Sequence, residues 1–181
     1  MKARCRLRMA AVLLLAGAAA DTCLHWTAIA AHAASLPKVV LSAESLAPRP
    51  IEQRTGEAVT HDYAQAWQDL SEALNANRSD LIGDYITGDA KLRLSQRIAD
   101  QKKAGIHTKY IDNGHQVRAV FYSPDGGEMQ LVDRVQLEIQ IFDGDKLISS
   151  SNSVAKYLVL MTPGTDRWYL RSLESVPENA F

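Results

Sequence analysis

Residues 128–142 read EMQLVDRVQLEIQIF, and this stretch decides the fold class. Apolar side chains recur at nearly every second position from Met129 to Ile141, and most of the intervening positions hold glutamine, glutamate or arginine. Strict alternation is typical of a β-strand that buries one face and leaves the other wet. One residue breaks the apolar series, because Asp133 stands between Leu131 and Val135. The stretch therefore predicts a long sheet strand with a carboxylate on its buried face.

Further strands are expected on both sides of this one, because turn residues separate other runs of period two. Asp143-Gly144 is a strong hairpin signal between two such runs. Asn113-Gly114, the segment 123–127 (SPDGG) and Pro163-Gly164 also have turn chemistry. These turns divide the C-terminal half into expected strands at 106–112, 115–122, 128–142, 146–161 and 167–176.

Upstream of the strands the apolar period changes to that of a helix. Tyr63, Trp67, Leu70 and Leu74 form one stripe, and Ala90, Leu94 and Ile98 form another. A short helix is expected between them over 79–86, and Gly105 fits a left-handed cap after the last one. The order predicts an α+β domain in which two to three N-terminal helices pack on a curved antiparallel sheet of four to five strands.

The N-terminus has the pattern of an export leader. Lys2, Arg4, Arg6 and Arg8 precede an apolar stretch that continues with small residues as far as Ala34. Cleavage is expected before Asp21 or Ala34, and the alternative is an uncleaved anchor with its cationic end in the cytoplasm. The protein is therefore expected to be periplasmic or secreted, or else held in the inner membrane with its domain outside.

Three regions follow from these patterns: a leader or anchor over 1–34, a flexible linker over 35–59 and the α+β domain over 60–178. Prolines 37, 48 and 50 punctuate the linker, and its short apolar stretch, 39–41, shows no sustained period. The alternative for that stretch is a strand that docks on the domain or on a partner.

Composition excludes several functions. Four of the 20 basic and one of the 21 acidic residues lie in the leader, so the remainder has a formal charge of about −4. No basic run survives outside the leader, and nucleic-acid binding is not expected. Both cysteines, Cys5 and Cys23, lie in the leader, which excludes a thiolate metal site in the domain. His107 and His115 lack a third ligand, so no metal is expected, and no cofactor motif is present.

Asp133 and His115 are the candidate binding residues. If the turn at 123–127 pairs Tyr122 with Glu128, then Phe121 faces Met129, Val117 faces Asp133 and His115 faces Val135. His115 and Asp133 are then diagonal neighbours on one face, within reach of each other. A buried carboxylate is costly unless it has a partner. The pair is expected to be either the floor of a pocket, able to bind a polar ligand or act as a general base, or a hydrogen bond within the core.

The order of elements, with the aromatic strand Arg167-Trp168-Tyr169-Leu170 at its end, resembles the nuclear transport factor 2-like, or cystatin-like, superfamily over residues 62–177. That resemblance implies a cone of helices on a curved sheet. Members include ketosteroid isomerase-like enzymes, small ligand-binding proteins and assembly domains. The layout is also similar to membrane-anchored periplasmic assembly factors of type IV secretion systems.

Three functions follow as expectations. The first is an exported, non-catalytic domain that binds a partner protein or a small hydrophobic or polar ligand, with a homodimer left open. The second is a small cofactor-free isomerase, cyclase or dehydratase that uses His115 and Asp133. The third is a membrane-anchored assembly or scaffold factor, which contacts the membrane only through an uncleaved N-terminal segment. A deep pocket lined by His115 and Asp133 favours the enzyme, and an interior filled by side chains favours a binding domain.

Overall fold

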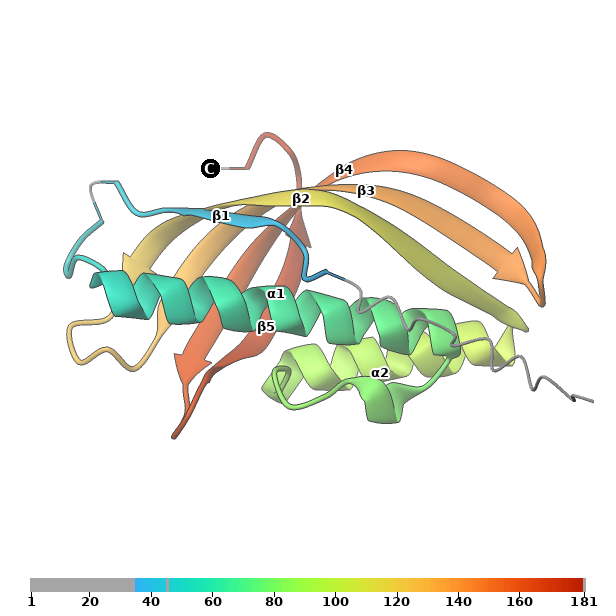
Figure 1. The fold of residues 1–181 in the computed structure, drawn as a ribbon, viewed down its shortest axis with the longest axis horizontal. Helices are drawn as coiled ribbons and strands as arrows, with labels where there is room; N and C mark the ends of the chain where they lie inside the picture. The colour runs from blue at the N-terminus through green and yellow to red at the C-terminus, as the bar shows by residue number, and fades with distance from the viewer. Residues whose placement is uncertain (1–34, 45, 181) are drawn as a thin grey trace, which may run out of the picture. The chain divides into compact units, whose positions relative to one another are not determined.

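A computed structural model describes residues 35–44 and 46–180 (Figure 1). The expected leader or anchor over 1–34 lies outside the described residues. In the part of the chain that is described, no helix has the length and apolar character that crossing a membrane requires.

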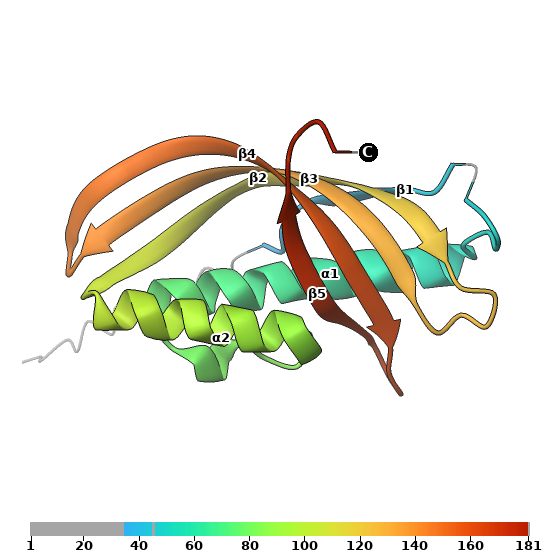
Figure 2. The same cartoon turned by 180° about the vertical axis from the view of Figure 1, so that it is seen from behind.

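The fold is α+β, with two helices packed on a five-stranded, curved, mixed sheet. The strands lie in chain order across the sheet, and both helices cover its concave face (Figures 1 and 2). The elements are β1 (Val39–Ser42), α1 (Gln53–Ala76), η1 (Ser79–Leu81), α2 (Gly88–Lys103), β2 (Ile106–Tyr122), β3 (Met129–Asp143), β4 (Lys146–Pro163) and β5 (Trp168–Val176).

The expectation of a flexible linker over 35–59 is corrected by the structure, because most of that segment belongs to the folded domain. β1 pairs in parallel with residues 115–118 of β2, which makes the sheet mixed and not purely antiparallel. α1 begins at Gln53, before the expected boundary at residue 60. A four-residue strand is too short to show a period in the sequence, and its backbone hydrogen bonds to β2 define it instead.

The short helix expected over 79–86 is only the single 3₁₀ turn η1. Ile82 and Ile86 are nevertheless buried, and Ile86 forms an isolated parallel bridge with Leu170 of β5. Their apolar spacing therefore reflects burial against the sheet and not a helix. α2 ends as expected, and Gly105 follows it with a φ of 74°, where a side chain would be strained.

The two strands expected at 106–112 and 115–122 form one long strand, β2. Asn113-Gly114 produces a register shift inside that strand where a turn was expected, and Gly114 has a φ of 115°. The partner strand β3 is continuous past this point, so β2 holds one extra residue there as a bulge, and the pairing resumes at His115.

The register of β2 with β3 agrees with the expectation at Val117–Asp133 and His115–Val135. It differs nearer the turn, where Tyr122 faces Met129 and Phe121 faces Gln130. A second shift between Ala119 and Phe121 absorbs the one-residue difference. The expected pairing at the turn was wrong by one residue, and the unexpected shift compensates for it. The buried face of β3 is therefore the one that the alternation predicted.

Candidate functional site

A buried carboxylate lies at the centre of the domain, where α1 crosses the sheet. The side chain of Asp133 is 0% exposed. Its Oδ2 accepts a hydrogen bond from the hydroxyl of Tyr63, at 2.7 Å, and lies 2.7 Å from Nδ1 of His115. Its Oδ1 has no hydrogen-bond partner among the described residues. Helix α1 supplies Tyr63 and the sheet supplies the other two residues, so the network joins the two layers of the fold.

A second carboxylate completes the network from the other side of the imidazole. Nε2 of His115 lies 2.7 Å from Oδ2 of Asp112, and the backbone N–H of Gly114 donates to Oδ1 of the same carboxylate, at 2.7 Å. The register shift at Asn113-Gly114 brings the side chain of Asp112 close to that of His115, which follows three residues later in the chain. The side chain of Asp112 is 20% exposed, and it is therefore the network's route to solvent.

The contact between His115 and Asp133 is present as the strand register predicted. Binding of a ligand by these two residues stays a prediction. Tyr63 and Asp112 were missed as members of the network. In the sequence pattern, Tyr63 belongs to the apolar stripe of its helix and Asp112 to the end of a strand, and neither position points to a polar network. A buried carboxylate on β3 needs a donor from the helix that covers it, and that requirement was the available signal for Tyr63.

The two neighbouring carboxylates set the charge of His115. Burial by itself lowers the pKa of the imidazole, but the hydrogen bonds to Asp112 and Asp133 outweigh it and raise the pKa to about 9. Both ring nitrogens face carboxylate oxygens, so both must carry protons, which is the imidazolium form. Burial and the charge of Asp133 raise the pKa of Tyr63 well above its usual value, so its hydroxyl stays a neutral donor.

The free energy of unfolding is expected to fall as the pH rises through the range in which His115 loses its proton. The pKa of His115 is higher in the folded protein, about 9, than its ordinary value of 6.5. The stabilisation is therefore complete below about pH 6.5 and disappears as the pH approaches and passes 9. At about 1.4 kcal/mol per pKa unit, the free energy of unfolding should decrease by about 3 kcal/mol over that range. Urea unfolding at a series of pH values measures this decrease.

The matched variant is His115→Gln, in which the decrease between pH 6.5 and 9 should flatten. Proton NMR should place the imidazole pKa near 9 in the wild type and lower in Asp133→Asn. An imidazole that titrates at the same pH in the wild type and in Asp133→Asn would contradict the assignment.

A pocket of about 450 Å³ opens beside this network, and we call it the Trp67 pocket. Segment 35–38, Trp67 and Ser71 of α1, and Tyr110 and Asp112 of β2 form most of its wall. The indole of Trp67 also packs on the imidazole of His115, with ring centroids 4.6 Å apart. Asp112 therefore belongs to both the pocket and the network, whereas the side chain of His115 is 0% exposed.

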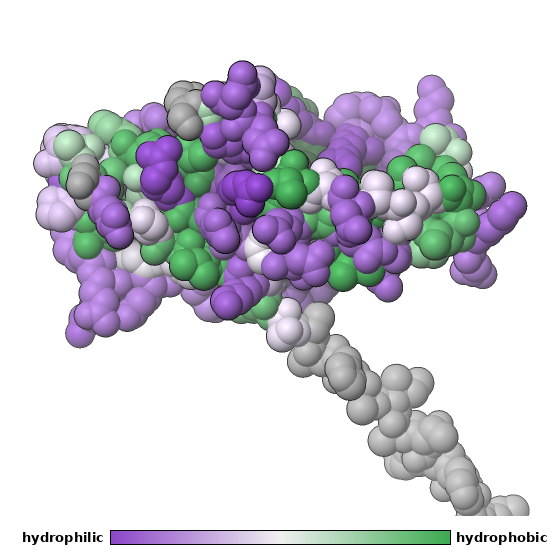
Figure 3. Space-filling model, turned by 90° about the horizontal axis from the view of Figure 1, so that it is seen from above, coloured by the Kyte–Doolittle hydropathy of each residue, from purple (hydrophilic) through white to green (hydrophobic). Residues whose placement is uncertain are grey.

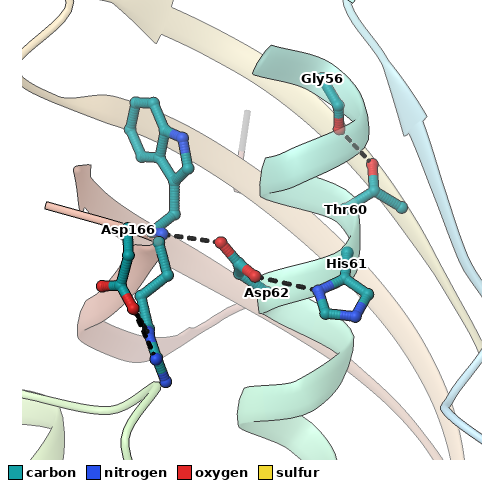
Figure 4. A network of polar contacts seen from close by, with 7 residues as sticks. Gly56, Thr60, His61, Asp62 and Asp166 are labelled. Atoms are coloured by element: carbon teal, nitrogen blue, oxygen red, sulfur yellow. Dashed lines mark hydrogen bonds and ion pairs between the residues drawn. The ribbon is translucent and has the colours of Figure 1, made fainter. Parts of the chain in front are cut away.

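Another buried carboxylate, Asp62, has a structural role. Its Oδ2 accepts a hydrogen bond of 2.7 Å from the backbone N–H of Trp168 (Figure 4). This bond connects α1 to the first residue of β5. Its Oδ1 lies 3.0 Å from Nδ1 of His61, whose side chain is 55% exposed. Asp62 lies in a contact between elements, and both of its oxygens have partners there.

The described residues contain no group of three or more His, Cys, Asp or Glu side chains placed to hold a metal ion. His107, considered with His115 in the sequence, instead stacks on Phe142, with ring centroids 5.0 Å apart and planes 3° from parallel. The two histidines are therefore engaged in separate contacts, one with an aromatic ring and one with carboxylates.

Comparison with known proteins places the fold. No protein-family model matches the chain, and no curated protein matches it. Among solved structures, the intermembrane-space region of the chloroplast protein ARC6 aligns with 72% of this chain and 100% of its own, at 15% identity and a TM-score of 0.60.

Two other structures align less closely. One, from Streptomyces avermitilis, is described as a dehydratase of the NTF2-like family (12% identity, 68% of this chain and 99% of its own, TM-score 0.44). The other, from Nostoc punctiforme, is described as having a cystatin-like fold (12% identity, 67% and 94%, TM-score 0.42). The α+β fold expected from the element order, with helices packed on a curved sheet, is confirmed, and the ARC6 region shares it. At these identities the likeness concerns the fold alone.

Proposed function

We propose that this protein is a non-catalytic binding domain that acts outside the cytoplasm and takes its ligand in the Trp67 pocket. The observation that carries the proposal is the closure of the polar network. The side chains of His115 and Asp133 are both 0% exposed, and the indole of Trp67 packs against the imidazole. A general acid or base must come within hydrogen-bond distance of the substrate, and these two groups are enclosed by protein.

The lining of the pocket favours a particular kind of ligand. Trp67 and Tyr110 line the pocket with the small part of their side chains that is exposed, 2% and 8%, and favour an apolar group on the ligand. Asp112 and Glu72 supply two carboxylates, against the single ammonium of Lys38. A ligand that joins an aromatic or aliphatic body to a positively charged nitrogen matches this lining. A small organic amine and a lysine or arginine side chain of a partner protein share that chemistry.

The first test uses two probes that share a ring and differ in charge, phenethylammonium and phenylacetate. We expect phenethylammonium to shift the indole N–H resonance of Trp67 in an NMR titration of the full chain. Phenylacetate should bind at least about fivefold more weakly, because its carboxylate meets Asp112 and Glu72. A lysine-containing peptide tested in parallel distinguishes a partner-protein source from a small-molecule source.

A matched pair of variants separates the pocket from the rest of α1. Glu72→Gln removes a charge from the wall and should weaken phenethylammonium binding by about two- to fivefold, as expected for an exposed ion pair. Glu57→Gln makes the same change on the same helix, outside the Trp67 pocket, and should leave binding unchanged. Equal binding of both probes, or no shift at Trp67, would overturn the proposed ligand class.

The enzyme alternative rests on one observation, which is that Asp112 contacts both the pocket and His115. A proton from the imidazole would have to reach a ligand through that carboxylate. The closed network favours binding over catalysis, because the same contacts that raise the pKa of His115 also hold its two protons in place.

A further inference from the structure

Strand β4 is longer than the neighbour that covers its outer edge. β5 pairs with β4 only from Lys156 to Pro163, whereas β3 pairs along β4 from Lys146 to Met161. Residues 147–155, which we call the β4 edge, therefore have one side of their backbone unpaired within the described part of the chain. Figures 1 and 2 show this part of β4 arching out beyond the end of β5.

The β4 edge lacks most features that prevent sheets from joining at their edges. Its sequence, LISSSNSVA, contains no charged residue and no proline, which are common protections of edge strands. The single register shift near it leaves Ile148 without a β3 partner and lies at the hairpin end. An exposed strand of this kind is a template for another strand, because its backbone N–H and C=O groups point outward.

Exposed apolar side chains gather on the same segment. Leu147, Ile148 and Val154 are 47%, 52% and 47% exposed, and they are three of the five exposed large apolar residues of the described chain. Figure 3 looks onto the domain from the sheet side and shows green residues at the end that carries the β3–β4 hairpin, among others elsewhere on this face. Apolar exposure concentrated on one strand marks an interaction site more than scattered residues do.

The order of residues along the β4 edge points to its occupant. In an antiparallel pair centred on Ser151, Ile148 faces Val154, and the register shift between Ser149 and Leu147 ends the regular pairing there. Between them, Ser149 faces Ser153 and Ser150 faces Asn152, so apolar residues meet apolar residues and hydroxyls meet polar groups. The segment is complementary to itself when reversed, and this is the requirement for a twofold contact between identical chains.

We propose that the β4 edge pairs antiparallel with the β4 edge of a second copy of this chain, with Ser151 on the twofold axis. The two five-stranded sheets then form one continuous sheet, and the partner strand occupies the position next to β4 where β5 has ended. This interface lies on the edge opposite β1, so it goes beyond the proposed ligand pocket and leaves that pocket accessible.

Sedimentation equilibrium of the full chain, as purified from cells, tests the association. The expected mass is about twice that of the monomer, which is 19.9 kDa for the unprocessed chain. Ser151→Lys should reduce the species to a monomer, because two lysines would face each other across the axis. Ser42→Lys is the matched control, an exposed serine on the opposite edge strand, and should stay a dimer.

Oxidative cross-linking tests the register, in a background that carries Cys5→Ser and Cys23→Ser. Ser151→Cys should form a disulfide-linked dimer, because the two residues face each other. Ser149→Cys should not, since the two sulfurs would lie about four residues, or roughly 13 Å, apart along the strands. A monomeric wild type, a dimer that Ser151→Lys leaves intact, or equal cross-linking at 149 and 151 would each overturn the proposal.

Discussion

Asp133→Leu is expected to lower the free energy of unfolding by about 3–5 kcal/mol, the range for breaking a buried charged pair by removing one partner. The change leaves the imidazolium of His115 with Asp112 alone and removes the acceptor of the Tyr63 hydroxyl. Leucine has the same branched skeleton of heavy atoms as aspartate and a larger volume, so it leaves no cavity. The loss therefore reports the unpaired polar groups together with some overpacking. Urea unfolding at pH 7 measures it, and Asp145→Ala, in the exposed β3–β4 turn, should change stability by less than about 0.5 kcal/mol.

The combined variant Tyr63→Phe, His115→Leu, Asp133→Leu gives the sharper comparison. It removes both partners of the two hydrogen bonds to Asp133 and leaves Asp112, whose side chain is 20% exposed. It also removes Oδ1 of Asp133, which is buried without a partner in the described chain. Replacing a whole buried polar network by apolar groups is often close to neutral. We therefore expect the combined variant to be more stable than Asp133→Leu alone. A combined variant that is less stable would show that the network contributes net stability to this fold.

Trp67→Ala is expected to cost about 3–5 kcal/mol of unfolding free energy, as for other buried aromatic residues. Trp67 is 2% exposed and packs against Tyr63, Tyr110, His115 and Tyr157, so its removal leaves a cavity between α1 and the sheet. The denaturant midpoint should fall with little change in the slope of the transition.

The control for Trp67→Ala is Leu92→Ala on α2. Leu92 is 70% exposed, so its truncation should change stability by no more than about 0.5 kcal/mol. A Trp67→Ala midpoint within that same margin would mean that the indole contributes little to the core. The same variant removes the ring that lies between the Trp67 pocket and His115. It should therefore also weaken binding of the phenethylammonium probe.

The sequence predicted the elements whose pattern extends over many residues. The alternation along 128–142 identified β3 and its buried face, and the spacing of Tyr63, Trp67 and Leu70 identified the inward face of α1. A pattern that repeats over many residues is little affected by single exceptions. These predictions therefore tolerated an error of one residue at the turn before β3. The contact between His115 and Asp133 followed from the same arithmetic of strand pairing.

Short elements and irregular positions were not predictable in this way. β1 has only four residues, and its place in the sheet depends on backbone hydrogen bonds to a strand more than 70 residues later. Asn113-Gly114 has the composition of a hairpin turn, yet the continuous strand β3 beside it converts the dipeptide into a bulge. In both places a distant partner decides between conformations that the local sequence allows equally.

By itself, the sequence determined the α+β class, the order of the two long helices and the sheet strands that follow them, and the polar pair on the buried face. These depend on periodicity and on the fixed geometry of paired strands. Only the tertiary structure decided that Tyr63 and Asp112 join that pair, that Trp67 separates it from the pocket, and that β5 ends before it covers all of β4. Those features depend on which side chains from distant elements meet. The residue at which a strand ends beside its neighbour is likewise set by packing and not by local preference.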